Sequence, residues 1–167
     1  RPPRSTLFPY TTLFRSLGDD APDFKLHDGD LNFVTGGEYK GQRVVLAFFP
    51  AAFTGVCKTE MCIFQDSLSA LNDANATVLG ISVDAPFSNK AFAEDNGISF
   101  PILSDYTRST THAYGVPLED FAGMEGYTAA QRSVFIVDEE GNLMWKWIAD
   151  SPGEEPDYAE VLAILTT

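Results

Sequence analysis

The chain of 167 residues is 44% hydrophobic and 13% aromatic, which is typical of one packed globular domain. Its 11 basic and 24 acidic residues give a formal net charge of −13, a field that repels phosphate backbones and anionic lipid. The charge therefore disfavours a nucleic-acid partner. No apolar run approaches the roughly 20 residues that cross a bilayer, so we expect no membrane association either.

Residues 1–16 differ from the rest of the chain. They hold three arginines and no acid, repeat Thr-Leu-Phe, and lack the continuous apolar core of a secretory signal. We expect them to be a non-native or disordered extension, either read-through of cloning or adapter sequence or a short native addition. The expected domain is therefore residues 17–167, where eight basic and 24 acidic residues leave a net charge of −16.

The acidic residues are scattered over the whole domain, and the chain has only five lysines. A surface of this kind suits a salt-rich cytoplasm, so we expect a cytoplasmic protein from a halophilic organism. The alternative is an ordinary acidic surface that serves solubility.

Short apolar strands alternate with helical stretches from Ala21 onward. Residues 31–34 and Tyr39 predict a small hairpin around Gly36-Gly37. Residues 44–49 are apolar on both faces, as is typical of a central parallel strand. Apolar residues then recur at spacings of three and four, which predicts a helix over 56–74.

The second half of the chain continues this alternation. The expected elements are a strand at 78–83, a helix at 88–96 opened by Ser88, an edge strand at 100–103 with Pro101, a short helix at 107–114, strands at 133–137 and 143–148, and a helix at 158–165. Alternating strands and helices with one late hairpin indicate an α/β sandwich, in which helices flank a central mixed sheet.

The two cysteines, Cys57 and Cys62, follow the apolar strand and Pro50 closely. A cysteine in the first turn of a helix lies where unpaired N–H groups and the helix dipole favour negative charge. Because an ordinary thiol is mostly protonated at neutral pH, a nucleophilic role needs this help and a nearby cation. Cys57 has the right position, although a free cysteine can equally be a small buried hydrophobe.

The stretch P-A-A-F-T-G-V-C places Pro50 and Thr54 seven and three residues before Cys57. Here the chain resembles the peroxiredoxins of the AhpC/TSA superfamily, whose pattern is Pro, three residues, Thr or Ser, two residues, Cys. The resemblance extends over about residues 20–165. It includes A-P-D-F (21–24), F-F-P (48–50), T-E (59–60), G-I-S-V-D (80–84), F-P-I-L-S-D (100–105), A-Y-G-V (113–116) and R-S-V-F-I-V-D (132–138).

Among the peroxiredoxins, the chain is most similar to the subgroup of bacterioferritin comigratory protein and its actinobacterial relatives, the alkyl hydroperoxide reductase E kind. The stretch F-P-A-A-F-T-G-V-C favours that branch. Together with the acidic composition, this resemblance suggests a halophilic archaeon as the source.

The resemblance implies a thioredoxin-like fold and a thiol-dependent peroxidase that acts on hydrogen peroxide and organic hydroperoxides. Cys57 as a thiolate would attack the peroxide and become a sulfenic acid. Thr54 and Arg132 would stabilise the charge that develops, and Pro50 would shield the thiolate from water. Each also has an ordinary explanation: Thr54 as a helix cap, Arg132 as a surface ion-pair partner and Pro50 as a strand terminator.

Two further residues are carried over from the resemblance. Glu60 matches the family's acid after the cysteine and would orient Arg132, although the helix dipole alone explains an acid there. Cys62 is the expected resolving cysteine, which would form an intramolecular disulfide with Cys57. Residues five apart in an intact helix have Cα atoms about 8.6 Å apart, beyond the roughly 7 Å limit of a disulfide, so the helix must unwind. The alternative is a buried Cys62 and an external resolving thiol.

The implied partners are a peroxide and a thioredoxin-like or other dithiol reductant, with the protein acting as a monomer or homodimer. We expect no metal or other cofactor. Zinc ligands usually come in pairs two to four residues apart, whereas His27 and His112 lie far apart in the sequence. Two alternative functions stay open. A disulfide reductase on the same fold would need Cys-x-x-Cys instead of the observed four-residue gap, and a redox-sensing module would not turn over.

Overall fold

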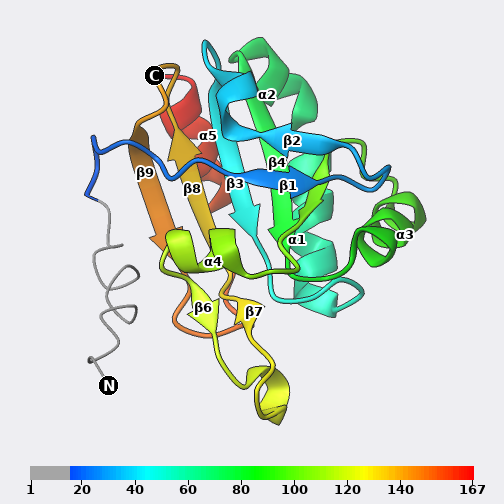
Figure 1. Cartoon of the computed structure of the whole chain (residues 1–167). Coiled ribbons are helices and arrows are strands. Elements are labelled where there is room, and N and C mark those ends of the chain that lie inside the picture. Colours follow the sequence, from blue (N-terminus) through cyan, green and yellow to red (C-terminus); the bar gives the residue numbers. More distant parts are fainter. Residues whose placement is uncertain (1–15) are drawn as a thin grey trace, which may run out of the picture.

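The computed structural model describes residues 16–167, and the expected extension lies almost entirely outside the described residues. A mixed seven-stranded sheet with the order β2-β1-β5-β4-β3-β8-β9 forms its centre (Figure 1). Its strands are β1 (Lys25–His27), β2 (Phe33–Thr35), β3 (Arg43–Phe48), β4 (Ala76–Ser82), β5 (Ile102–Ser104), β8 (Ser133–Val137) and β9 (Leu143–Ile148). A separate pair, β6 (Pro117–Leu118) and β7 (Ala129–Ala130), extends from the lower end in Figure 1.

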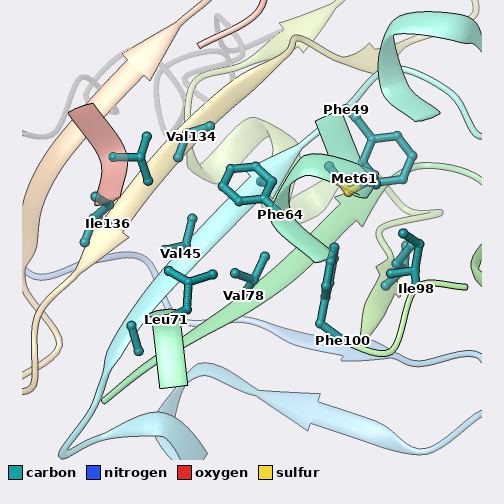
Figure 2. Packing of buried hydrophobic residues seen from close by; sticks show 14 of the residues in the cluster. Val45, Phe49, Met61, Phe64, Leu71, Val78, Ile98, Phe100, Val134 and Ile136 are labelled. Atoms are coloured by element: carbon teal, nitrogen blue, oxygen red, sulfur yellow. The ribbon is translucent and has the colours of Figure 1, made fainter. Parts of the chain in front are cut away.

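Helices cover both faces of the sheet. They are α1 (Gly55–Asp66), α2 (Leu68–Asp73), α3 (Pro86–Asn96), α4 (Ser109–Ala113) and α5 (Tyr158–Leu165). Figure 2 shows the core beneath α1, where Met61 and Phe64 pack with Val45, Val78 and Val134 of the sheet. The opposite face has a second core, which contains Phe24, Leu46 and Tyr114. In the part of the chain that is described, no helix is long and apolar enough to cross a bilayer.

The strand register brings two distant parts of the sequence together. β3, β4 and β5 are parallel, so their carboxyl ends lie together at one end of the sheet. α1 begins after β3 at this end. β8 runs antiparallel to β3, and its first residue, Ser133, pairs with Phe48 at the end of β3. Arg132 directly precedes Ser133 and therefore lies at the end of the sheet where α1 begins.

Two expectations for the first half of the chain are wrong. No hairpin forms around Gly36-Gly37: β2 pairs with β1 instead, and Gly36–Tyr39 is a 3-10 turn. β1 has only three residues, too few to show an alternating pattern. The expected helix over 56–74 is two helices, because it breaks at Ser67, whose hydroxyl donates to the carbonyl of Ile63 at 2.9 Å.

Two further expectations need correction in the middle of the chain. The segment at 100–103 is not an edge strand, because β5 lies between β4 and β1. Pro101 precedes β5, where its missing N–H removes no ladder hydrogen bond, while its carbonyl accepts from Gly80 N at 3.0 Å. α3 starts at Pro86 instead of Ser88, since proline fits the first helical positions. The strands at 133–137 and 143–148 and the helix at 158–165 are confirmed.

The acidic surface should make the protein more stable as salt rises. Ion pairs such as Arg43–Glu139 weaken in salt, but repulsion among 24 acids outweighs a few attractive pairs. Counterions screen this repulsion beyond about 10 Å at 0.1 M salt and over shorter distances at higher concentration. We therefore expect the melting temperature to increase steadily from low to molar potassium chloride, measured by circular dichroism. A melting temperature that does not change would remove the case for a halophilic origin.

Candidate active site

Cys57 lies in the first turn of α1. The first hydrogen bond of the helix runs from Lys58 N to the Thr54 carbonyl at 3.0 Å, so the N–H of Cys57 precedes the intrahelical bonds. The helix dipole therefore favours negative charge at this sulfur. Cys57 is only 1% exposed, which keeps bulk water from its side chain.

Arg132 supplies the cation beside the sulfur. Its Nη2 donates to Cys57 Sγ at 3.0 Å, and its Nη1 donates to Glu60 Oε2 at 2.6 Å. The guanidinium also donates from Nε and Nη2 to the Pro152 carbonyl, at 3.2 and 3.1 Å. Because the Arg132 side chain is 2% exposed, it is not the surface ion-pair partner that an ordinary explanation allows.

Glu60 is the buried acid of the site, and its burial opposes its ionisation. Complete burial raises the pKa of Glu60 to about 7, the charge of Arg132 opposes this rise, and Glu155 adds to it. One oxygen, Oε1, has no hydrogen-bond partner among the described residues. Burial lowers the pKa of Arg132, but Glu60 and Cys57 outweigh burial and raise it, so the guanidinium stays charged. The site thus holds one permanent cation and two groups that can carry negative charge.

Thr54 and Pro50 lie in the loop between β3 and α1. Thr54 is the N-cap residue, yet its side chain makes no capping hydrogen bond, and its hydroxyl donates to the Ala51 carbonyl at 2.8 Å. The lone pairs of the hydroxyl are therefore available to accept a hydrogen bond. Pro50 is buried at the same end of the sheet. Between them, Phe53 has a φ of 63°, a left-handed conformation that is rare for a bulky residue.

Cys62 lies in the same helix as Cys57, and both cysteines are free. α1 is unbroken from Gly55 to Asp66, and Cys62 is half-buried against the core. The two cysteines thus lie in one intact helix without a disulfide between them, which is the arrangement that must unwind before they can pair.

The structure adds groups that the sequence did not point to. The Pro152 carbonyl contacts Arg132, but a backbone carbonyl leaves no signal in a sequence. Tyr158 donates to Glu155 Oε1 at 2.8 Å and packs edge-on against Phe64, 5.6 Å between ring centroids. Burial, this hydrogen bond and the charge of Glu60 raise the pKa of Tyr158 far above its usual value. Residues 16–167 contain no group of three or more His, Cys, Asp or Glu side chains arranged to hold a metal ion.

Comparisons with known proteins identify the family of the chain. The chain matches the AhpC/TSA family over residues 17–146. It is 36% identical over 157 residues to alkyl hydroperoxide reductase E of Mycobacterium tuberculosis, and the alignment covers 90% of this chain and 98% of that protein. It is 33% identical over 132 residues to peroxiredoxin Bcp of Bacillus subtilis, and the alignment covers 78% of this chain and 83% of that protein.

Solved structures show the same fold. The peroxidoxin BcpB of Mycobacterium tuberculosis superimposes with a TM-score of 0.79 at 27% identity, over 89% of this chain and 95% of that one. A peroxiredoxin-like protein of Aquifex aeolicus gives a TM-score of 0.80 at 30% identity, over 90% and 86%. The expected thioredoxin-like fold and the expected peroxidase class are confirmed. This chain belongs to the AhpC/TSA family of peroxiredoxins.

Proposed function

We propose that the protein reduces hydrogen peroxide and organic hydroperoxides with Cys57 as the peroxidatic nucleophile. The observation that carries this proposal is the 3.0 Å hydrogen bond from Arg132 Nη2 to Cys57 Sγ in a buried site at the start of α1. A fixed cation and a helix N-terminus both favour the thiolate. The same donors then face the oxygen that becomes negative in the reaction.

The first chemical step breaks the O–O bond. The thiolate attacks the terminal oxygen of ROOH, a sulfur–oxygen bond forms, and sulfur is oxidised by two electrons while the peroxide is reduced. The sulfenic acid keeps the hydrogen of that oxygen, and the departing RO⁻ takes a proton from solvent and leaves as water or an alcohol. Arg132 stabilises this developing anion. Thr54 accepts a hydrogen bond from the peroxide O–H, because its own hydrogen is donated to Ala51.

The second step is resolution by Cys62. The Cys62 sulfur attacks the sulfenic sulfur, a disulfide forms, and hydroxide leaves as water with the proton of Cys62. A thioredoxin-like or other dithiol then reduces the disulfide. Because both cysteines belong to α1, its first turns must unwind before the sulfurs meet. Cys57 is the third residue of the helix, so unwinding starts next to it.

Cys62→Ser tests the resolution step. After one equivalent of peroxide, the parent protein should lose two hydrogens and yield a peptide that links residues 57 and 62. The variant should gain one oxygen on Cys57 and turn over on the order of tenfold more slowly with thioredoxin, since a foreign thiol must enter a buried site. Non-reducing mass spectrometry and a coupled thioredoxin assay measure both. A parent protein with a stable added oxygen, an alkylatable Cys62 and a normally active variant would indicate a one-cysteine mechanism.

Continuous assay with excess thioredoxin and its reductase tests the function itself. Many turnovers for each protein molecule support the peroxidase, whereas one equivalent of peroxide consumed indicates a redox-sensing module. Disulfide reduction without peroxide consumption would indicate a disulfide reductase. We further propose that the protein works in a cytoplasm, where dithiol reductants keep thiols reduced, as a monomer or homodimer.

A further inference from the structure

Asp84, just beyond the carboxyl end of β4, contacts the loop that leads to Cys57. Its Oδ2 accepts from the backbone N–H of Ala52 at 2.8 Å and from the Ser82 hydroxyl at 2.9 Å. Ala52 lies between β3 and α1, 32 residues before Asp84. This contact therefore joins the loop to a different strand of the sheet.

Asp84 is itself held from several sides by buried polar groups. Its carbonyl accepts from the Ser104 hydroxyl at 2.6 Å, and its N–H donates to Ser82 Oγ at 3.2 Å. Asn89 completes this set: its Nδ2 donates to the carbonyl of Leu103 at 3.4 Å, and its Oδ1 is 2.9 Å from Ser82 Oγ. Ser82, Asn89 and Ser104 are all buried, so Asp84 is a fixed point on the sheet.

The loop that Asp84 contacts needs such a fixed point. Phe53, the next residue after Ala52, has a φ of 63°, and a bulky residue keeps this conformation only where its surroundings hold it. Phe53 is 59% exposed, and its ring packs edge-on against that of Phe92 at 5.5 Å between centroids. Burial of Phe53 alone therefore restrains the turn weakly. The hydrogen bond from Ala52 to Asp84 is a direct backbone restraint on it.

We propose that Asp84 is a positioning residue, which holds the turn at residues 51–54 so that Thr54 and Cys57 keep their places. The effect on the peroxide reaction rests on the proposed function, but the effect on Cys57 exposure does not. Loss of the acceptor oxygen of Asp84 frees the turn, displaces the Thr54 oxygen and lets the first turn of α1 open. Cys57 then becomes more accessible to reagents and less reactive with peroxide.

Three variants separate this role from others. Asp84→Ala removes the acceptor, Asp84→Asn keeps an amide oxygen of the same reach, and Asp95→Ala removes an exposed carboxylate from α3 as a charge control. In protein without peroxide, iodoacetamide should alkylate Cys57 about tenfold faster in Asp84→Ala, with Cys62 unchanged. The second-order rate constant with hydrogen peroxide should fall about tenfold. Asp84→Asn should stay within about threefold of the parent for both rates, and Asp95→Ala should match it.

Several outcomes would overturn the proposal. Unchanged Cys57 alkylation in Asp84→Ala would show that the loop does not depend on Asp84. Equal acceleration at Cys57 and Cys62, with a large fall in melting temperature, would show a general structural role. If Asp84→Ala does not fold, Asp84→Ser, whose polar atom is one bond closer to the backbone, takes its place with the same expected rates. A parent protein that does not consume peroxide would refute the proposed function, while the alkylation rates would still decide the role of Asp84.

Discussion

Replacing Cys57 by serine is expected to abolish peroxide consumption and to leave the fold unchanged. A serine hydroxyl stays protonated near neutral pH and cannot accept the oxygen atom, so the reaction loses its nucleophile. Serine is slightly smaller than cysteine and still offers an oxygen to Arg132 Nη2, which donates to the sulfur at 3.0 Å in the parent. The charged guanidinium therefore keeps an acceptor. Peroxide consumption with excess dithiol measures activity, and near-ultraviolet circular dichroism with thermal melting measures the fold.

Cys62→Ser is the matched control for this variant, since it removes the other thiol of the same helix. It should keep the first oxidation step, seen as one added oxygen on Cys57. A Cys57→Ser protein that retains most of the parent's activity would disprove the assignment of the nucleophile. If Cys57→Ser melts far below the parent, Cys57→Ala tests the same chemistry without a buried hydroxyl.

Arg132→Lys is expected to lower the second-order rate constant with peroxide by about 10²-fold. The guanidinium divides its donors among Cys57, Glu60 and the Pro152 carbonyl, and one ammonium cannot reproduce that fork. Glu60, which is fully buried, then competes with Cys57 for the single cation. The pH at which iodoacetamide alkylation reaches half its maximum should therefore rise. Stopped-flow peroxide reduction and an alkylation profile from pH 4 to 10 measure both effects.

Arg108→Lys provides a control of the same chemistry away from the site. Arg108 also donates to backbone carbonyls, to Thr128 at 3.0 Å and to Tyr106 at 2.6 Å, but contacts neither cysteine in the described structure. It should leave both the rate constant and the alkylation profile unchanged. Arg132 would have no catalytic role if Arg132→Lys matched the parent in both measurements.

The regular elements were predictable where their pattern was long. β3, β8, β9 and α5 were expected within one residue, because runs of five or six largely apolar residues and helical spacing are distinctive. β1, β6 and β7 have two or three residues each, and such segments carry no periodicity. The break at Ser67 was missed since the apolar spacing of the two helices continues across it. The break depends on a hydrogen bond to Ile63, which spacing does not reveal.

The candidate site was predictable as a set of residues but not as a set of contacts. Cys57 and Arg132 are 75 residues apart, and only the pairing of β3 with β8 explains why they meet. The dipole explanation for Glu60 predicts an exposed acid in the first helical turn, whereas Glu60 is the sixth residue of α1, is buried and is paired with Arg132. Asp84 was quoted as part of G-I-S-V-D, yet its contact with Ala52 joins loops that follow different strands. Such contacts depend on the register of the sheet, which the sequence does not display.

The break at Ser67 divides the segment after Cys57 into two separate helices, α1 and α2. The carbonyl of Ser67 accepts from Leu71 N at 3.0 Å, and Leu71 is completely buried against the core, so α2 has its own hydrogen bonds and packing. Unwinding that begins at Gly55 can therefore end at Ser67 without opening α2. For the proposed disulfide between Cys57 and Cys62, the helix opening that brings the two sulfurs together involves at most the twelve residues of α1, and it leaves the packing of α2 on β4 in place.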